Sequence, residues 1–345
     1  MIKGKVFLLT IVFFTVISFG IFAGGTQEQP EAEDSSAATI EPAADSDTIE
    51  PLNVTIATLK GPSGMAAAKM VDENFQPGSN VNASYIVLSS PLEAVSKMTS
   101  GEIDAAFLPV NTAAKLYTKG LKFRLAAVTG RGSLYMLSTS EAAEGWDSLK
   151  GKTIYLTGKG ATPDYLLRYL LINNGLDPET DVNLDFTSTP AQIVQLLAAG
   201  KADTAFIPQP FAMLAGVKAK AKTIIDPQKE LMKIRGTEKA FPFTAFVLSE
   251  RFINSNPEAA SSVLEELSTS INWVKTNPEE ASIVIEKIGI LGAAVAKPAI
   301  PVSGIKFISA EESEADVMDF LQMLNELDPV SVGGKLPDEG FFFKS

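Results

Sequence analysis

Short apolar runs alternate with stretches of helical spacing along most of the chain. Runs rich in branched residues, such as VTIATL at 54–59, predict strands, whereas apolar residues spaced three and four apart predict helices. The first predicted strands are 54–59, 83–88, 105–108 and 122–129, and the first predicted helices are 65–74, 90–100 and one capped by Asn111. Strands that alternate with helices form doubly wound, mostly parallel sheets, so the pattern predicts an α/β fold.

The same pattern returns 99 residues further along the chain. Residues 101–109 (GEIDAAFLP) match 200–208 (GKADTAFIP), and SSPLEAV at 89–95 matches STPAQIV at 188–194. Lys60-Gly61 matches Lys159-Gly160 at the same offset. A period this long is too large for a solenoid repeat and fits a whole small α/β lobe. We therefore expect two similar lobes that hold a small ligand in the cleft between them.

The later elements indicate where each lobe begins and ends. Further strands are predicted at 135–139, 152–156, 183–186, 205–207 and 243–248, and further helices at 164–174, 190–199, 257–275, 278–288 and 311–327. The pattern breaks near Arg131, and the strand after residue 242 is expected to return to the first lobe. We expect lobe 1 to contain 51–132 and 243–345, and lobe 2 to contain 133–242.

The N-terminal region predicts export. Residues 1–23 have a basic start, an apolar run and a small-residue end, which is typical of a signal peptide, although the run is also long enough for an uncleaved anchor. Residues 24–50 hold eight acids and no Lys or Arg, which predicts a disordered tether. Gly25 stands where a lipid-attachment Cys would be, so we expect a freely diffusing periplasmic protein.

Composition excludes many kinds of chemistry. The chain has no Cys and no His, which removes disulfides, thiolate sites, the Ser-His-Asp triad and nearly every zinc site. No acidic spacing matches a calcium loop, so we expect no metal, no cofactor and no catalytic residue. The net charge of −12 falls to −6 without the signal peptide and tether, so nucleic acid is not an expected partner.

Two strand-to-helix loops, 60–64 and 157–163, occupy equivalent places in the two repeats. Ligands bind at the carboxyl ends of such strands, where helix N-termini favour an anionic or electron-rich group. Gly and Pro in these loops are also what tight turns require, and GKG at 158–160 is not a nucleotide-binding loop. The candidate contacts here are Pro62, Ser63, Gly64, Ser90, Gly160, Ala161 and Thr162.

A second set of candidates follows the repeated strands and the first crossing. Asn111, Gln209 and Phe211 come directly after the repeated strands, and Ser133 and Tyr135 lie at the crossing. The amides can hydrogen-bond a solute and the aromatic rings can cover its face; the alternatives are helix capping and core packing. Asp104 and Asp203 precede the same strands at the opposite end, which favours a structural role over acid–base chemistry.

Several stretches resemble one family. They are 59–65 (LKGPSGM), 104–117, 149–155, 158–164 (GKGATPD) and 333–338 (GGKLPD) followed by Phe341-Phe342. Together they resemble the extracytoplasmic solute-binding proteins of ABC importers, in the group of nitrate, sulfonate, taurine and thiamine-precursor binders. The resemblance covers Pro51 to Ser345 and implies the type II periplasmic-binding fold, in which two lobes close on a solute.

The resemblance predicts a solute-binding protein that delivers a small organic solute, anionic or heteroaromatic, to an ABC permease in the inner membrane. We expect a monomer and no enzymatic activity. An exported enzyme on the same fold is the alternative, and a structural surface protein is a more distant one. The absence of His and the predicted signal peptide both weigh against the enzymes known on this fold.

Overall fold

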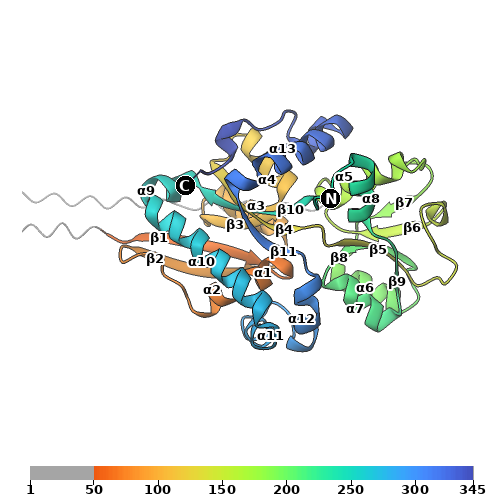
Figure 1. Cartoon of the computed structure of the whole chain (residues 1–345), viewed down its shortest axis with the longest axis horizontal. Helices are drawn as coiled ribbons and strands as arrows, with labels where there is room; N and C mark the ends of the chain where they lie inside the picture. The colour runs from red at the N-terminus through yellow and green to blue at the C-terminus, as the bar shows by residue number, and fades with distance from the viewer. Residues whose placement is uncertain (1–49, 345) are drawn as a thin grey trace, which may run out of the picture. The chain divides into compact units, whose positions relative to one another are not determined.

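The computed structural model describes residues 50–344, which form two β-sheets, each flanked by helices (Figure 1). The predicted signal peptide, and the predicted tether apart from residue 50, lie outside the described residues. The α/β class predicted from the alternation of strands and helices is confirmed. We call the six-stranded sheet with its helices lobe 1 and the five-stranded sheet with its helices lobe 2.

Lobe 1 is built from two separate parts of the chain. The first part contains β1 (Leu52–Leu59), α1 (Pro62–Ala66), α2 (Ala68–Asp72), β2 (Val81–Leu88), α3 (Pro91–Ser100), β3 (Ala105–Pro109), α4 (Val110–Thr118) and β4 (Phe123–Arg131). The second part contains β10 (Pro242–Ser249), α9 (Glu250–Ser255), α10 (Pro257–Thr276), α11 (Pro278–Lys287), α12 (Ala293–Ala299), η2 (Ile300–Val302), β11 (Ile305–Ser309), α13 (Ala310–Leu327), η3 (Pro329–Val332) and η4 (Glu339–Phe341). Helices α4 and α13 cover one face of the sheet, and α1, α2 and α10 cover the other (Figure 1).

Lobe 2 is one continuous stretch of chain. It contains β5 (Leu134–Ser138), η1 (Asp147–Leu149), β6 (Thr153–Leu156), α5 (Thr162–Asn173), β7 (Asn183–Asp185), α6 (Pro190–Ala198), β8 (Thr204–Pro208), α7 (Phe211–Ala219), β9 (Lys222–Ile225) and α8 (Pro227–Arg235). Helices α5 and α8 lie on one side of the sheet, and α6 and α7 lie on the other (Figure 1).

The strand order repeats between the lobes, as the sequence repeat does. The parallel set β2-β1-β3 of lobe 1 corresponds to the parallel set β7-β6-β8 of lobe 2. The next strand in each sheet arrives from the other lobe and runs antiparallel: β10 beside β3, and β5 beside β8. Each sheet therefore contains the predicted parallel set and is mixed, because the crossing strand enters it in the opposite direction.

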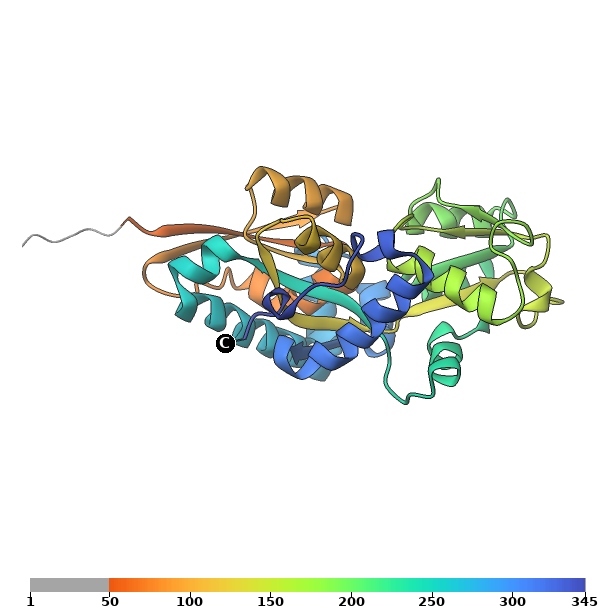
Figure 2. The ribbon, with the colours of Figure 1, turned by 90° about the horizontal axis from the view of Figure 1, so that it is seen from above.

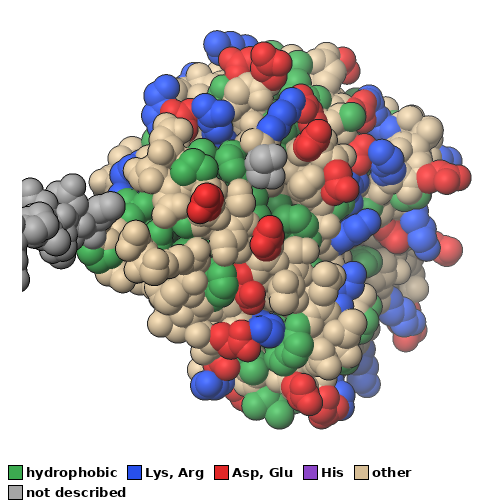
Figure 3. Space-filling view, turned by 60° about the vertical axis from the view of Figure 1, so that its left-hand side comes forward, with side chains coloured by type: hydrophobic (Ala, Val, Ile, Leu, Met, Phe, Trp, Pro, Cys, Tyr) green, Lys and Arg blue, Asp and Glu red, His purple; other side chains and the backbone are tan. Residues whose placement is uncertain are grey.

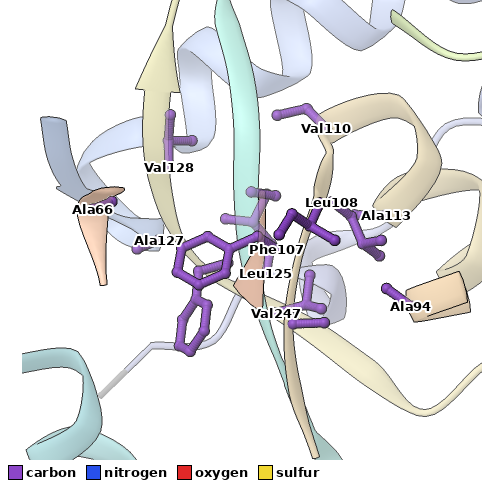
Figure 4. Close-up of a cluster of buried hydrophobic side chains, with 14 of the residues drawn as sticks. Ala66, Ala94, Phe107, Leu108, Val110, Ala113, Leu125, Ala127, Val128 and Val247 are labelled. Atoms are coloured by element: carbon purple, nitrogen blue, oxygen red, sulfur yellow. The ribbon is translucent and has the colours of Figure 1, made fainter. Parts of the chain in front are cut away.

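The repeated motif supplies the centre of each core. Phe107 of β3 and Phe206 of β8 occupy equivalent positions, and both are fully buried. The ring centroids of Phe107 and Phe246 are 4.8 Å apart. Figure 4 shows Phe107 among side chains such as Leu108 and Leu125. Burial of one such side chain stabilises the fold by about 1.5–3 kcal/mol. The repeat therefore marks the strand around which each lobe packs.

Two local predictions were wrong. The predicted helix over 65–74 forms as α1 and α2 with a break at Ala67, and α1 begins at Pro62 because Gly61 turns the chain with a φ of +109°. Ser63 and Gly64 therefore lie in the first turn of α1. Asn111 does not cap α4, because that helix begins one residue earlier. The unpredicted helices are α7, α8, α9 and α12, and the unpredicted strands are β9 and β11.

Candidate functional site

Helix α5 of lobe 2 and helix α4 of lobe 1 meet where the two repeats face each other. Each follows a central strand, α4 after β3 and α5 after β6, so both begin at the carboxyl end of a sheet. The Thr162 hydroxyl at the start of α5 donates a hydrogen bond of 2.9 Å to Oδ1 of Asn111 in α4. Both residues are fully buried. The structure thus brings together two of the residues that the sequence predicted as solute contacts.

A third polar residue, Ser331 of η3, joins this pair and was not predicted. Nδ2 of Asn111 donates a hydrogen bond of 3.0 Å to the Ser331 carbonyl oxygen. The Ser331 hydroxyl is itself fully buried and has no hydrogen-bond partner among the described residues. A buried hydroxyl without a partner costs free energy, so a bound molecule that reached it would recover that cost.

A second contact between the lobes lies one turn further along α5. Burial raises the pKa of Tyr165 to about 12, and the negative charge of Asp328 acts in the same direction. Figure 2 shows the segment that follows α13 beside α5. A cavity of about 870 Å³ opens next to this contact and is lined from both lobes, by Lys159, Gly160 and Arg168 on one side and Leu327 on the other.

The helix N-termini at this junction present free N–H groups. No side chain caps α4 or α5, whereas Ser90 caps α3 and Thr189 caps α6. Uncapped N–H groups carry the positive end of the helix dipole. Asp164 in the first turn of α5 accepts hydrogen bonds from Gly160 N and Arg168 Nε, at 2.8 and 2.7 Å, so its charge is already paired. The junction is therefore weakly electropositive.

The predicted residues near the first crossing form a group in lobe 2. The Gln209 side chain accepts a hydrogen bond of 3.1 Å from Met213 N, so it binds the first turn of α7. Gln209 N donates to the Ser133 carbonyl at 2.8 Å, and Ser133 has a φ of +70°. Burial raises the pKa of Tyr135, whose hydroxyl lies beside Gln209. Phe211 begins α7 and is partly buried against the lobe 2 core.

The remaining predicted residues lie in the two loops. Gly64 packs tightly, because a Cβ there would lie 2.4 Å from Ile290 Cδ1 and 2.6 Å from the Leu59 carbonyl oxygen. Gly160 has a φ of +72° and open space around it, and Ala161 is the N-cap residue of α5. Pro62 and Ser63 form the first turn of α1. Within residues 50–344, no hydrogen bond joins the α1 loop to lobe 2.

The two repeated aspartates have structural partners. The Asp104 carboxylate accepts hydrogen bonds from Thr55 N, Ser249 Oγ and Arg251, at 3.2, 3.0 and 2.6 Å, and so ties β1 to the end of β10. Asp203 pairs with Lys152 at 3.1 Å. Among the described residues, no three acidic side chains gather as a metal site would require.

The comparisons with known proteins identify the family. The model of the NMT1-like family matches residues 50–289. The chain belongs to the NMT1-like family. No curated protein matches the sequence of this NMT1-like chain.

Solved structures similar to this NMT1-like protein include an ABC transporter protein from Parabacteroides distasonis. It is 29% identical, covers 84% of this chain and 98% of its own, and has a TM-score of 0.71. The alkanesulfonate-binding protein SsuA of Xanthomonas axonopodis, bound to MOPS, is 17% identical with a TM-score of 0.64, and covers 84% of this chain and 96% of its own. The periplasmic nitrate-binding protein NrtA of Synechocystis is 15% identical with a TM-score of 0.61, and covers 81% of this chain and 82% of its own.

These neighbours confirm the predicted type II periplasmic-binding fold, with two α/β lobes and two crossings between them. They also confirm the resemblance to binding proteins of ABC importers, which are associated with transport and not with catalysis. None of the helices within residues 50–344 combines the length and the apolar character needed to cross a bilayer.

Proposed function

We propose that this NMT1-like protein is the periplasmic solute-binding component of an ABC-type importer. It captures a small organic solute between lobes 1 and 2 and delivers it to a permease in the inner membrane. One observation carries the proposal: α4 and α5, from opposite lobes, present uncapped N-termini to each other across the bond between Asn111 and Thr162. A solute held at that junction would contact both lobes and favour their closure.

The chemistry of the junction favours an anionic or electron-rich solute. Asn111, Thr162 and Ser331 offer amide and hydroxyl groups, and the helix ends add positive potential. The ring of Tyr135 or Phe211 can cover a heteroaromatic face. Two of the similar structures are named as alkanesulfonate-binding and nitrate-binding proteins, and these compounds are the first to test. The proposed contacts remain the predicted set, Pro62, Ser63, Gly64, Ser90, Asn111, Ser133, Tyr135, Gly160, Ala161, Thr162, Gln209 and Phe211, together with Ser331.

The proposal also states where the protein lies and which parts of the chain move. We place the protein in the periplasm as a monomer, with residues 133–242 moving as one lobe against 51–132 and 243–345. Basic and acidic side chains are intermixed over the face in Figure 3, a pattern that does not favour a polyanion such as nucleic acid.

Analysis of retained ligand tests the function directly. Protein produced in its own host should release about one small molecule per chain on denaturation, measured by mass spectrometry. The double variant Asn111→Leu, Thr162→Val, produced in the same way, should release much less. Incubation of the released compound with fresh protein should leave it chemically unchanged, whereas conversion to a product would favour the enzyme. If nothing is released, and sulfonates, nitrate and heteroaromatic compounds all fail to raise the melting temperature, the proposal is wrong.

A further inference from the structure

Both crossings between the lobes are tied to a single carboxylate on α13. Oδ2 of Asp316 accepts a hydrogen bond of 2.6 Å from Nη2 of Arg131, at the end of β4, where the chain leaves lobe 1. Oδ1 accepts a hydrogen bond of 2.9 Å from Nζ of Lys239, in the segment that returns to lobe 1 before β10. The two oxygens of one side chain thus hold both segments in which the chain crosses between the lobes.

Other contacts close a ring around this carboxylate. Nη1 of Arg131 donates a hydrogen bond of 2.6 Å to the Ala240 carbonyl, so the two crossings also bind each other directly. The Phe241 ring stacks on Phe320, one turn after Asp316 on α13, with centroids 5.6 Å apart and planes inclined by 19°. A cavity of about 40 Å³ lies inside this ring of residues, beside Asp316. The crossings are therefore packed against α13 as well as bonded to it.

The ion pair with Arg131 is shielded from water. Side-chain exposure is 17% for Asp316 and 12% for Arg131, whereas Lys239 is 69% exposed. An ion pair as buried as the first is held more strongly than an ordinary surface pair, and loss of one partner leaves an uncompensated charge. The Arg131 contact should therefore contribute more than the Lys239 contact to the position of the crossings.

We propose that Asp316 is a positioning residue that fixes the angle between the lobes and sets how readily they close. The proposal deepens the proposed function, because closure on a solute is what this angle would control. In the described arrangement the carboxylate contacts are made and the lobes touch through Asn111 and Thr162. Removal of the charge should favour other arrangements. A purely structural ion pair would stabilise lobe 1 and leave the angle unchanged.

The experiment measures the distance between the lobes without any solute. The chain has no Cys, so Ser96→Cys on α3 and Gln195→Cys on α6 give two unique sites for spin labels. Both positions are exposed, and they are equivalent in the two repeats. In Asp316→Asn, the population of molecules at the wild-type label separation should fall relative to the population at other separations. The ratio of the two populations should change by about fivefold or more, as expected for a change of about 1 kcal/mol. Lys239→Met should shift the ratio in the same direction by less, and Lys239→Arg should leave it unchanged.

The matched control is Asp72→Asn. Asp72 is 20% exposed and pairs with Lys287 at 2.6 Å, entirely within lobe 1. The Asp72→Asn variant therefore loses an ion pair that involves neither crossing segment. An unchanged distance distribution in folded Asp316→Asn overturns the proposal, and so does an equal shift in Asp72→Asn. If Asp316→Asn fails to fold, Lys239→Met decides by the same criterion. Because no solute is present, failure here would leave solute binding untouched, and failure to find a solute would leave this result standing.

Discussion

Replacement of Thr162 by Val removes the buried hydrogen bond to Asn111 between the lobes and nothing else of comparable size. Val has nearly the shape of Thr but no hydroxyl, so Oδ1 of Asn111 would stay buried without its donor. A buried acceptor that loses its partner costs about 1–3 kcal/mol. This corresponds to about a 5- to 150-fold change in an equilibrium constant.

The cost falls on one arrangement of the lobes. With the lobes together, the Asn111 oxygen has no access to water, whereas with the lobes apart water can replace Thr162. Thr162→Val should therefore depopulate the described arrangement by about 5- to 150-fold relative to open ones. The stability of each lobe should change little, because the lost bond lies within neither lobe.

Spin labels at positions 96 and 195 measure this population, and a urea titration followed by circular dichroism measures the stability of the lobes. The control is Thr99→Val, which removes a hydroxyl that bonds only its own helix, to the Val95 carbonyl at 2.8 Å. If the distance distribution of Thr162→Val matches that of wild type, the bond does not hold the lobes together and the reasoning fails. A double-mutant cycle with Asn111→Leu would isolate the energy of the pair.

Three further predictions concern stability. Gly304→Ala should lower it by more than about 1 kcal/mol in a urea titration, because the new Cβ would lie 2.3 Å from the Arg131 carbonyl oxygen at a φ of +69°; unchanged stability would refute this. Asp104→Asn should cost about 1–3 kcal/mol while solute affinity is kept, since its bonds lie away from the junction; lost affinity in the folded variant would count against it. Burial raises the pKa of Asp316, but hydrogen bonds from Lys239 and Arg131 outweigh it and hold the pKa below its usual value. The ionised Asp316 carboxylate therefore stabilises the fold above about pH 4, and this contribution is lost as the pH falls further. Between about pH 6 and pH 3, the free energy of unfolding measured by urea titration should fall less in Asp316→Asn than in wild type.

The parts of the site that could be predicted from sequence follow from a local rule. Asn111 comes just after β3, and Thr162 ends the loop that follows β6; side chains at the carboxyl ends of such strands gather at one edge. The rule needs only the order of elements, which hydrophobic periodicity supplies. It does not say that the two side chains touch, because that depends on the angle between the lobes.

Ser331 and Asp328 could not be predicted in the same way. They follow the last long helix, and the hydrogen bond from Asn111 to Ser331 spans 220 residues of sequence. Only the packing of η3 against α4 brings them to the junction. The nearby motif GGKLPD marks a turn but carries no sign of a partner. Likewise, the tight contact of Gly64 with Ile290 cannot be separated by sequence from the needs of a simple turn.

The directions of the two crossing strands, β5 and β10, could not be predicted for a related reason. Periodicity predicts that 135–139 and 243–248 are strands, but not which way they run beside β8 and β3. That direction follows from the exchange of one strand between the lobes, which is a property of the whole topology. The short strands β9 and β11 lie at sheet edges, where pairing on one side only gives a weak apolar pattern.

The repeat and the segment after it make different contributions to the junction. The repeated part supplies the bond between Asn111 and Thr162, one residue from each copy but at positions that are not equivalent in the repeat. The other contacts that bear on the angle between the lobes use α13 and η3, which have no counterpart in lobe 2: Asp316 with Arg131 and Lys239, Asp319 with Arg235, Phe320 with Phe241, and Asp328 with Tyr165. The unrepeated segment also packs into the core, through buried α13 side chains such as Phe320 and Leu321. Changes at Asp316 and Asp319, which lie outside the core, can therefore retune closure while the buried face of α13 stays as it is.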